Sequence, residues 1–135
     1  MTGILAGITL KTTLRQKYIS LIQGLALQTK QIVEKIGNQF DTIVVTGGVT
    51  KNSFFMQTLS DVCEIKVLCI EDSVLSGTAM LAKQAVYGLS VDLKSMLPIT
   101  NGIYLPNINL QKYYRQKWEV YLKMQDLSKF ISTKK

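Results

Sequence analysis

The chain has 135 residues, of which 47% are hydrophobic and 8% aromatic, a composition that favours one folded domain over a disordered segment. It contains no histidine, which excludes histidine bases, Ser-His and Cys-His nucleophile pairs, and histidine metal ligands. The formal net charge is +7, and residues 110–135 hold seven basic and two acidic side chains. The basic excess is therefore a property of the last segment, and any nucleic-acid binding would be expected there.

The sequence indicates neither a membrane nor an oxidising compartment. No apolar run approaches the roughly 20 residues that span a bilayer, and the apolar first ten residues lack the basic start of a signal peptide. Cys63 and Cys69 have neither metal-ligand nor redox spacing. Both are predicted to be small core residues of a cytoplasmic protein.

The first predicted element is a long helix over Leu14–Ile36. Thr13 followed by Gln16 fits a capping box at its start, and Gly37 supplies a stop at its end. Apolar residues recur at helical spacing between these ends, namely Leu14, Tyr18, Leu21, Ile22, Leu25, Ala26, Ile32, Val33 and Ile36.

A strand, a turn, a short helix and a second strand are predicted next. Thr42–Thr46 and Ile65–Ile70 have the apolar character of strands covered on both faces, as in a parallel sheet. A paired glycine, Gly47-Gly48, follows the first strand, and a helix is predicted over Ser53–Val62. Together these segments form one βαβ unit, for which a right-handed crossover is expected.

The glycine pair is a candidate turn for a phosphate or a nucleotide. It stands at the carboxyl end of a strand, where open α/β sheets hold their ligands, and glycines let a ligand approach the backbone closely. The amides of the following helix favour an anion. Gly47 and Gly48 match neither the spaced dinucleotide fingerprint nor a P-loop, so a simple change of direction from strand to helix is an equal alternative.

A third helix is predicted over Val74–Tyr87, capped by Ser73 and ended by Gly88. One of its faces consists of small residues that would let another backbone come close, namely Gly77, Ala79, Ala82 and Ala85. We expect Gly77 to be a packing residue rather than a ligand contact.

The remaining chain is predicted to be a connector and a last helix. After a brief helical turn at 92–97, residues 98–109 contain two prolines and an Asn-Gly pair, which favour a connector. The last helix is predicted over Leu110–Ile131, with apolar residues on two neighbouring stripes and charges elsewhere. One stripe contains Tyr114, Trp118, Tyr121 and Leu122, and the other contains Val120, Met124, Leu127 and Ile131. That pattern is typical of a docked helix with a solvated face.

Two apolar strands cannot make a sheet alone, because sheets usually have about five or six strands and bare apolar edges invite aggregation. The sequence therefore predicts that this chain is part of a larger sheet, completed upstream of Met1 or by another chain.

Three blocks of the sequence resemble the C-terminal part of the FGGY family of carbohydrate kinases, in the sugar kinase, Hsp70 and actin superfamily. The segment 7–26 resembles the family's second signature, 47–62 its adenosine motif, and 73–82 the hinge motif called connect 2. The ending over 112–123 resembles the pentulose (D-ribulose) kinase branch. Gln16 and Lys17 depart from the family's histidine and apolar residue, and Val49 stands where many members have a third glycine.

The resemblance implies an α/β fold: a partial ribonuclease H-like (actin-like ATPase) lobe with a parallel βαβ unit, flanking helices and a long C-terminal helix. Residues 1–97 would form part of the nucleotide-binding lobe, 98–109 the connector, and 110–135 a basic amphipathic helix and tail. The family's sugar domain, phosphate loops and catalytic aspartate lie upstream of the matched blocks and are not expected in this chain. The fragment is therefore expected to contain no catalytic residue and to be inactive alone.

The resemblance also implies ATP and Mg²⁺ as cofactors of the complete enzyme, with the upstream lobe as partner and the sugar bound elsewhere. Gly47 and Gly48 would meet the nucleotide, with the Gly48 amide near the α-phosphate, and Asn52 would meet the adenine. Asn52 is equally well suited to cap the following helix, and the two roles are compatible. Lys51 is expected to be a solvated charge, and Gln57 and Asp61 to be structural. An alternative function is a non-enzymatic module that binds an acidic partner or nucleic acid through the basic last helix; nucleic acid is the less expected partner.

Overall fold

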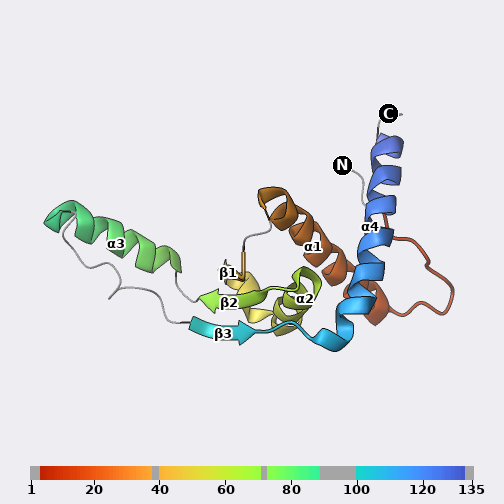
Figure 1. Ribbon diagram of the computed structural model, residues 1–135, viewed down its shortest axis with the longest axis horizontal. Helices are drawn as coiled ribbons and strands as arrows, with labels where there is room; N and C mark the ends of the chain where they lie inside the picture. The colour runs from red at the N-terminus through yellow and green to blue at the C-terminus, as the bar shows by residue number, and fades with distance from the viewer. Residues whose placement is uncertain (1–3, 38–39, 71–72, 89–99, 133–135) are drawn as a thin grey trace.

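The computed structural model describes residues 4–37, 40–70, 73–88 and 100–132 (Figure 1). These residues form an α/β fold, as predicted. The elements in chain order are α1 (Leu14–Ile36), β1 (Thr42–Thr46), the 3₁₀ helix η1 (Gly48–Lys51), α2 (Ser53–Cys63), β2 (Lys66–Ile70), α3 (Ser73–Tyr87), β3 (Thr100–Tyr104), the 3₁₀ helix η3 (Ile108–Leu110) and α4 (Gln111–Ser132). The helical turn predicted at 92–97 lies outside the described residues.

The limits of α1 are set by local chemistry, and both ends agree with the prediction. Thr13 Oγ1 accepts a hydrogen bond from the Gln16 backbone N–H at 3.2 Å, and Gln16 Oε1 accepts from the Thr13 N–H at 2.9 Å. This reciprocal pair is a capping box. At the other end, Gly37 has a φ of 131° and its N–H donates to the Val33 carbonyl, which ends the helix where glycine can turn the chain.

The predicted βαβ unit is present, because β1 and β2 are parallel and α2 connects them. A third strand, β3, pairs antiparallel with β2, so the strand order is β1-β2-β3. The register places Val44 beside Leu68, and Leu68 beside Ile103. The sheet of the described residues is therefore mixed, with β1 and β3 at its two edges.

The strand β3 lies within residues 98–109, where we expected only a connector. Asn101-Gly102 resembles a turn, but Gly102 is paired with Cys69 inside the sheet. A Cβ at position 102 would stand 3.3 Å from the Tyr104 ring, so glycine makes room for that ring on the same face of the strand. The pairing is irregular between Cys69 and Ile70, and glycine in a strand often accompanies such a bulge.

One face of the sheet is covered and holds the core. There α2 packs on β1 and β2, while α1 and α4 pack against α2 (Figure 1). The buried cluster contains Ala26, Leu27, Met56, Leu59, Val62, Cys63, Val67, Cys69 and Tyr114. Cys63 and Cys69 are free thiols in this cluster, which confirms their prediction as core residues.

The other face of the sheet is open among the described residues. Val44 is 55% exposed and Ile103 61% exposed, although both lie in one row with Leu68. Helix α3 extends away from the sheet at one end of the molecule (Figure 1), and its Leu75 and Leu81 side chains are also exposed. No described atom outside α3 and the neighbouring residues lies within 4 Å of a Cβ built on Gly77. The close helix crossing expected there is not formed within the described part of the chain.

None of the helices in the described ranges has both the length and the hydropathy needed to cross a membrane.

Candidate functional site

The glycine turn leaves the carboxyl end of β1 in a conformation that few side chains permit. Gly47 has a φ of 87° and a ψ of −170°, in the region that glycine alone occupies readily. Its carbonyl oxygen accepts from the Thr50 N–H at 3.1 Å and from Thr50 Oγ1 at 2.8 Å. The Asn52 N–H then donates to the Val49 carbonyl at 3.0 Å. These bonds form the turn of η1, which leads into α2.

Gly48 presents open backbone at the start of this turn. As the first residue of η1, it has an N–H with no acceptor inside that helix. Gly48 is exposed, and a Cβ built on it would have no neighbour within 4 Å. Its φ is not positive, so backbone strain does not require glycine there. Close approach of a ligand would need such open space over an N–H that is not used within the helix. Lys51, at the end of η1, is exposed, as expected of a solvated charge.

The Asn52 side chain caps α2, which confirms one of its two predicted roles. Its Oδ1 accepts from the Phe55 backbone N–H at 3.0 Å, the bond that defines an N-cap. Its Nδ2 donates to the Tyr18 hydroxyl on α1 at 3.3 Å. In the sequence Tyr18 is one of the residues at apolar helical spacing in α1, and no local signal connects it to a residue so far along the chain.

Gln57 and Asp61 are structural, as predicted. Gln57 Nε2 donates to Asp61 Oδ1 at 2.8 Å and to the Leu105 carbonyl at 2.9 Å. The same Asp61 oxygen accepts from the Asn107 backbone N–H at 2.8 Å, and Asp61 is 3% exposed. The pair thus fastens α2 to the chain that follows β3.

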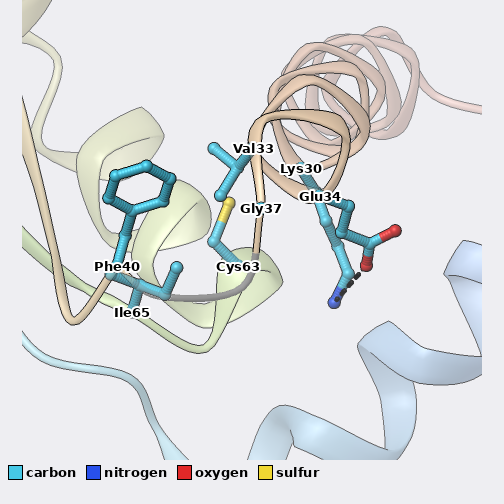
Figure 2. Close-up of a pocket in the computed structure, with 7 residues that line it drawn as sticks. All are labelled: Lys30, Val33, Glu34, Gly37, Phe40, Cys63 and Ile65. Carbon is cyan, nitrogen blue, oxygen red and sulfur yellow. Dashed lines mark ion pairs between the residues drawn. The ribbon is translucent and has the colours of Figure 1, made fainter.

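A pocket of about 210 Å³ lies away from the glycine turn, between the end of α1 and the end of α2 (Figure 2). Figure 2 shows the Lys30–Glu34 ion pair on one side and Cys63 pointing toward Val33. Phe40 and Ile65 mark this pocket as lying near the amino ends of β1 and β2. Because open α/β sheets bind ligands at the carboxyl ends of their strands, the glycine turn is the better candidate site.

The basic helix α4 is docked on the core through its aromatic side chains, as the stripe predicted. Tyr114 is buried, and Trp118 and Tyr121 pack against the core cluster. Two of the basic side chains are paired on the protein, Arg115 with Glu64 and Lys129 with Asp126. Among the described residues, no group of three or more Cys, Asp or Glu side chains could hold a metal ion.

The FGGY family of carbohydrate kinases, C-terminal domain, matches residues 1–86. The chain belongs to this family. The predicted resemblance is therefore confirmed, and it covers α1, the glycine turn and most of α3.

Relatives of this FGGY domain are sugar kinases and related proteins. An FGGY carbohydrate kinase domain-containing protein of Xenopus laevis is 31% identical over 92% of this chain and 24% of its own length. A ribulokinase of Shouchella clausii is 27% identical over 93% of this chain and 25% of its own length. A xylulose kinase structure from Rhodospirillum rubrum superposes with a TM-score of 0.80 at 18% identity, over 96% of this chain and 28% of that one. The chain spans about a quarter of the length of these proteins.

Proposed function

We propose that this FGGY domain supplies the nucleotide side of an ATP-dependent carbohydrate kinase, which transfers the γ-phosphoryl group of ATP to a sugar hydroxyl. The observation that carries the proposal is the open Gly47-Gly48 turn at the carboxyl end of β1. The Gly48 N–H would meet the α-phosphate, and Asn52 would meet the adenine.

The geometry of the turn supports an anionic ligand. The first amides of η1 and α2 point out of their helices without intrahelical acceptors, and the positive ends of helix dipoles favour negative charge. A phosphate needs backbone N–H groups that it can reach, and no described side chain stands over Gly48. Phosphoryl transfer depends mainly on positioning and charge stabilisation, so a domain that only holds the nucleotide contributes to the rate.

The rest of the chemistry is assigned to the upstream lobe of the same kinase. No described residue of this chain is a candidate catalytic base, and the catalytic aspartate and phosphate loops would come from that lobe. Magnesium that accompanies ATP is usually held by the phosphates, water and one or two carboxylates rather than by a cage of protein ligands. We therefore assign the Mg²⁺ to the complete kinase with ATP bound.

The proposed sugar is a pentulose. Similar proteins carry the names ribulokinase and probable L-xylulose kinase, although a glycerol kinase of Clostridium perfringens is also similar, at 30% identity. Phosphorylation assays of the complete kinase with D-ribulose, L-ribulose, L-xylulose and glycerol would test this choice. A preference for glycerol over every pentulose would contradict it.

The nucleotide role is tested by Gly48→Val in the complete kinase that carries this segment. The empty space and ordinary φ at Gly48 permit valine in the fold, but its side chain would stand between the backbone and the ligand. We expect the ATP dissociation constant to rise by about tenfold or more, with an unchanged melting temperature. Gly48→Ala is the matched control and should weaken binding less.

The outcome that contradicts the proposal is ATP binding by Gly48→Val as tight as that of the parent. The glycine pair would then be only a change of direction.

This chain alone should release no ADP from ATP in the presence of sugars, because oriented groups from the upstream lobe supply most of the rate.

A further inference from the structure

Tyr18 is joined to the glycine turn through the Asn52 side chain. Its hydroxyl oxygen accepts from Asn52 Nδ2 at 3.3 Å, across 34 residues of sequence. Tyr18 lies in the second turn of α1, and its side chain is 53% exposed. The tyrosine therefore remains accessible beside the start of α2 rather than being buried with the core face of α1.

The two hydrogen bonds of Asn52 leave its amide one orientation. Oδ1 accepts from the Phe55 backbone N–H, and an N–H donor can be satisfied only by the oxygen end of the amide. A flipped amide would place Nδ2 against that N–H and lose the cap. Because Oδ1 faces Phe55, Nδ2 faces Tyr18, and the hydroxyl oxygen holds it there.

Two hydrogen-bond donors remain at this point of the surface. An amide Nδ2 carries two hydrogens, and the Tyr18 oxygen takes one of them. The hydroxyl of Tyr18 accepts in this bond and therefore keeps its own hydrogen for donation. Neither remaining hydrogen has an acceptor among the described residues. Both donors lie next to the η1 turn, since Asn52 is the residue that directly follows η1.

We infer that Tyr18 is a positioning residue for the nucleotide base, holding the Asn52 amide so that its second N–H meets an acceptor atom of the base. The inference rests on the proposed function, because it takes ATP as the ligand of the glycine turn. Adenine presents ring nitrogens as acceptors on its edges, and asparagine amides pair with such atoms. Oδ1 already accepts in the cap, and Nδ2 still has a hydrogen to donate, which suits an acceptor on the base.

The test uses Tyr18→Phe in the complete kinase. The phenylalanine ring keeps the packing of Tyr18 but removes the oxygen that holds Nδ2. We expect the KM for ATP to rise about three- to tenfold with kcat within about twofold of the parent. Competitive inhibition by inorganic tripolyphosphate, which has phosphates but no base, should stay within about twofold of the parent, because the lost interaction is with the base.

A double-mutant cycle connects the effect to Asn52. Asn52→Ser retains a capping oxygen but lacks Nδ2, so it should raise the KM for ATP by a similar factor. If Tyr18 acts through Asn52, adding Tyr18→Phe to Asn52→Ser should change the KM little further. Two independent effects that multiply would overturn the inference.

Tyr113→Phe is the matched control. Its hydroxyl is hydrogen-bonded to the Gln23 amide between α1 and α4, and its side chain is 41% exposed. The chemical change and the exposure are alike, but the position is unrelated to Asn52. The KM for ATP and the inhibition constant of tripolyphosphate should equal those of the parent in this variant.

The outcomes separate this inference from the proposed function. If Gly48→Val weakens ATP binding and Tyr18→Phe does not, the nucleotide site stands and the role of Tyr18 is wrong. An equal loss of ATP and tripolyphosphate binding in Tyr18→Phe also overturns the inference, because it places the effect at the phosphates. If Gly48→Val leaves ATP binding unchanged, the proposed function and this inference fail together.

Discussion

Arg115 on α4 forms a bidentate ion pair with the carboxylate of Glu64, the residue that follows α2. Its Nε and Nη2 donate to Oε1 and Oε2 of Glu64 at 2.9 and 2.8 Å. Glu64 has a φ of 58° and a ψ of 31°, and it is the only non-glycine residue with a positive φ in the described ranges. A bidentate ion pair thus accompanies a backbone conformation that usually belongs to glycine.

The ion pair predicts a pH dependence of stability. Hydrogen bonding by Arg115 lowers the pKa of the Glu64 carboxyl below its usual value. A carboxyl with a depressed pKa in the folded state stabilises the protein above its unfolded pKa and loses that contribution as the pH falls through the folded pKa. Urea unfolding should therefore show Glu64→Gln less stable than the parent at pH 7, with the difference shrinking as the pH falls below the usual carboxyl pKa of 4.5.

The conformation of Glu64 predicts a difference between two truncations. Glu64→Ala and Glu64→Gly both remove the ion pair, but only glycine adopts a positive φ without steric cost. We expect Glu64→Gly to be more stable than Glu64→Ala by about 1 kcal/mol. Equal stabilities of the two variants would show that the turn after α2 relaxes when its side chain is lost.

Asp61 should matter for folding and not for nucleotide binding. Its buried carboxylate accepts from Gln57 Nε2 and from the Asn107 N–H, so Asp61→Ala leaves the Asn107 donor without its partner. We expect a loss of about 2 kcal/mol in the free energy of unfolding. The dissociation constant for ATP in the complete kinase should change less than about twofold, and a selective loss of ATP binding would instead make Asp61 a site residue.

The buried thiol of Cys63 should make the folded protein less stable in alkaline solution. Burial raises the pKa of its thiol from the usual 9.0 to about 11. The unfolded chain therefore loses this proton first, so stability is retained below pH 9 and falls between pH 9 and 11. Because the thiol pKa is about 11 in the folded protein and 9.0 in the unfolded chain, the free energy of unfolding should fall by about 2 kcal/mol at pH 11.

Cys63→Ala isolates this effect. Burial also raises the pKa of Tyr114 and Tyr121, but these tyrosines are present in both proteins. The stability difference between parent and variant, measured by urea unfolding, should shift in favour of the variant between pH 8 and 11. A constant difference across that range would show that the thiol is not buried in solution.

Gly77 should behave differently in this chain and in the complete kinase. Glycine inside a helix costs about 1 kcal/mol relative to alanine, and nothing in the described part of the chain stands against it. Gly77→Leu should therefore leave this chain as stable as the parent or slightly more so. In the complete kinase, where the connect 2 motif implies a hinge between lobes, we expect kcat to fall by about tenfold and ATP binding to change little.

Small-angle scattering of that Gly77→Leu kinase with both substrates would show whether the lobes still close. Normal closure with a normal kcat would place Gly77 away from the hinge.

The parts of the fold that follow from neighbouring residues were predictable. The ends of α1 depend on Thr13, Gln16 and Gly37, which act within one helical turn of each end. The turn after β1 was predictable because it depends on the backbone freedom of Gly47 alone. The cap by Asn52 was predictable because the N–H that it accepts from belongs to a residue only three positions away. Periodicity and caps are short-range properties, so a single sequence contains them in full.

Other features depend on segments that meet only after folding. Gly102 has the local character of a turn residue, but its segment pairs with β2 and forms a strand, in which glycine leaves room for the Tyr104 ring. The contacts of Tyr18 with Asn52 and of Arg115 with Glu64 span 34 and 51 residues, and no local pattern sets such a register. These contacts arise because α1, α2 and α4 share one core, and the packing of that core places their polar side chains within hydrogen-bonding distance.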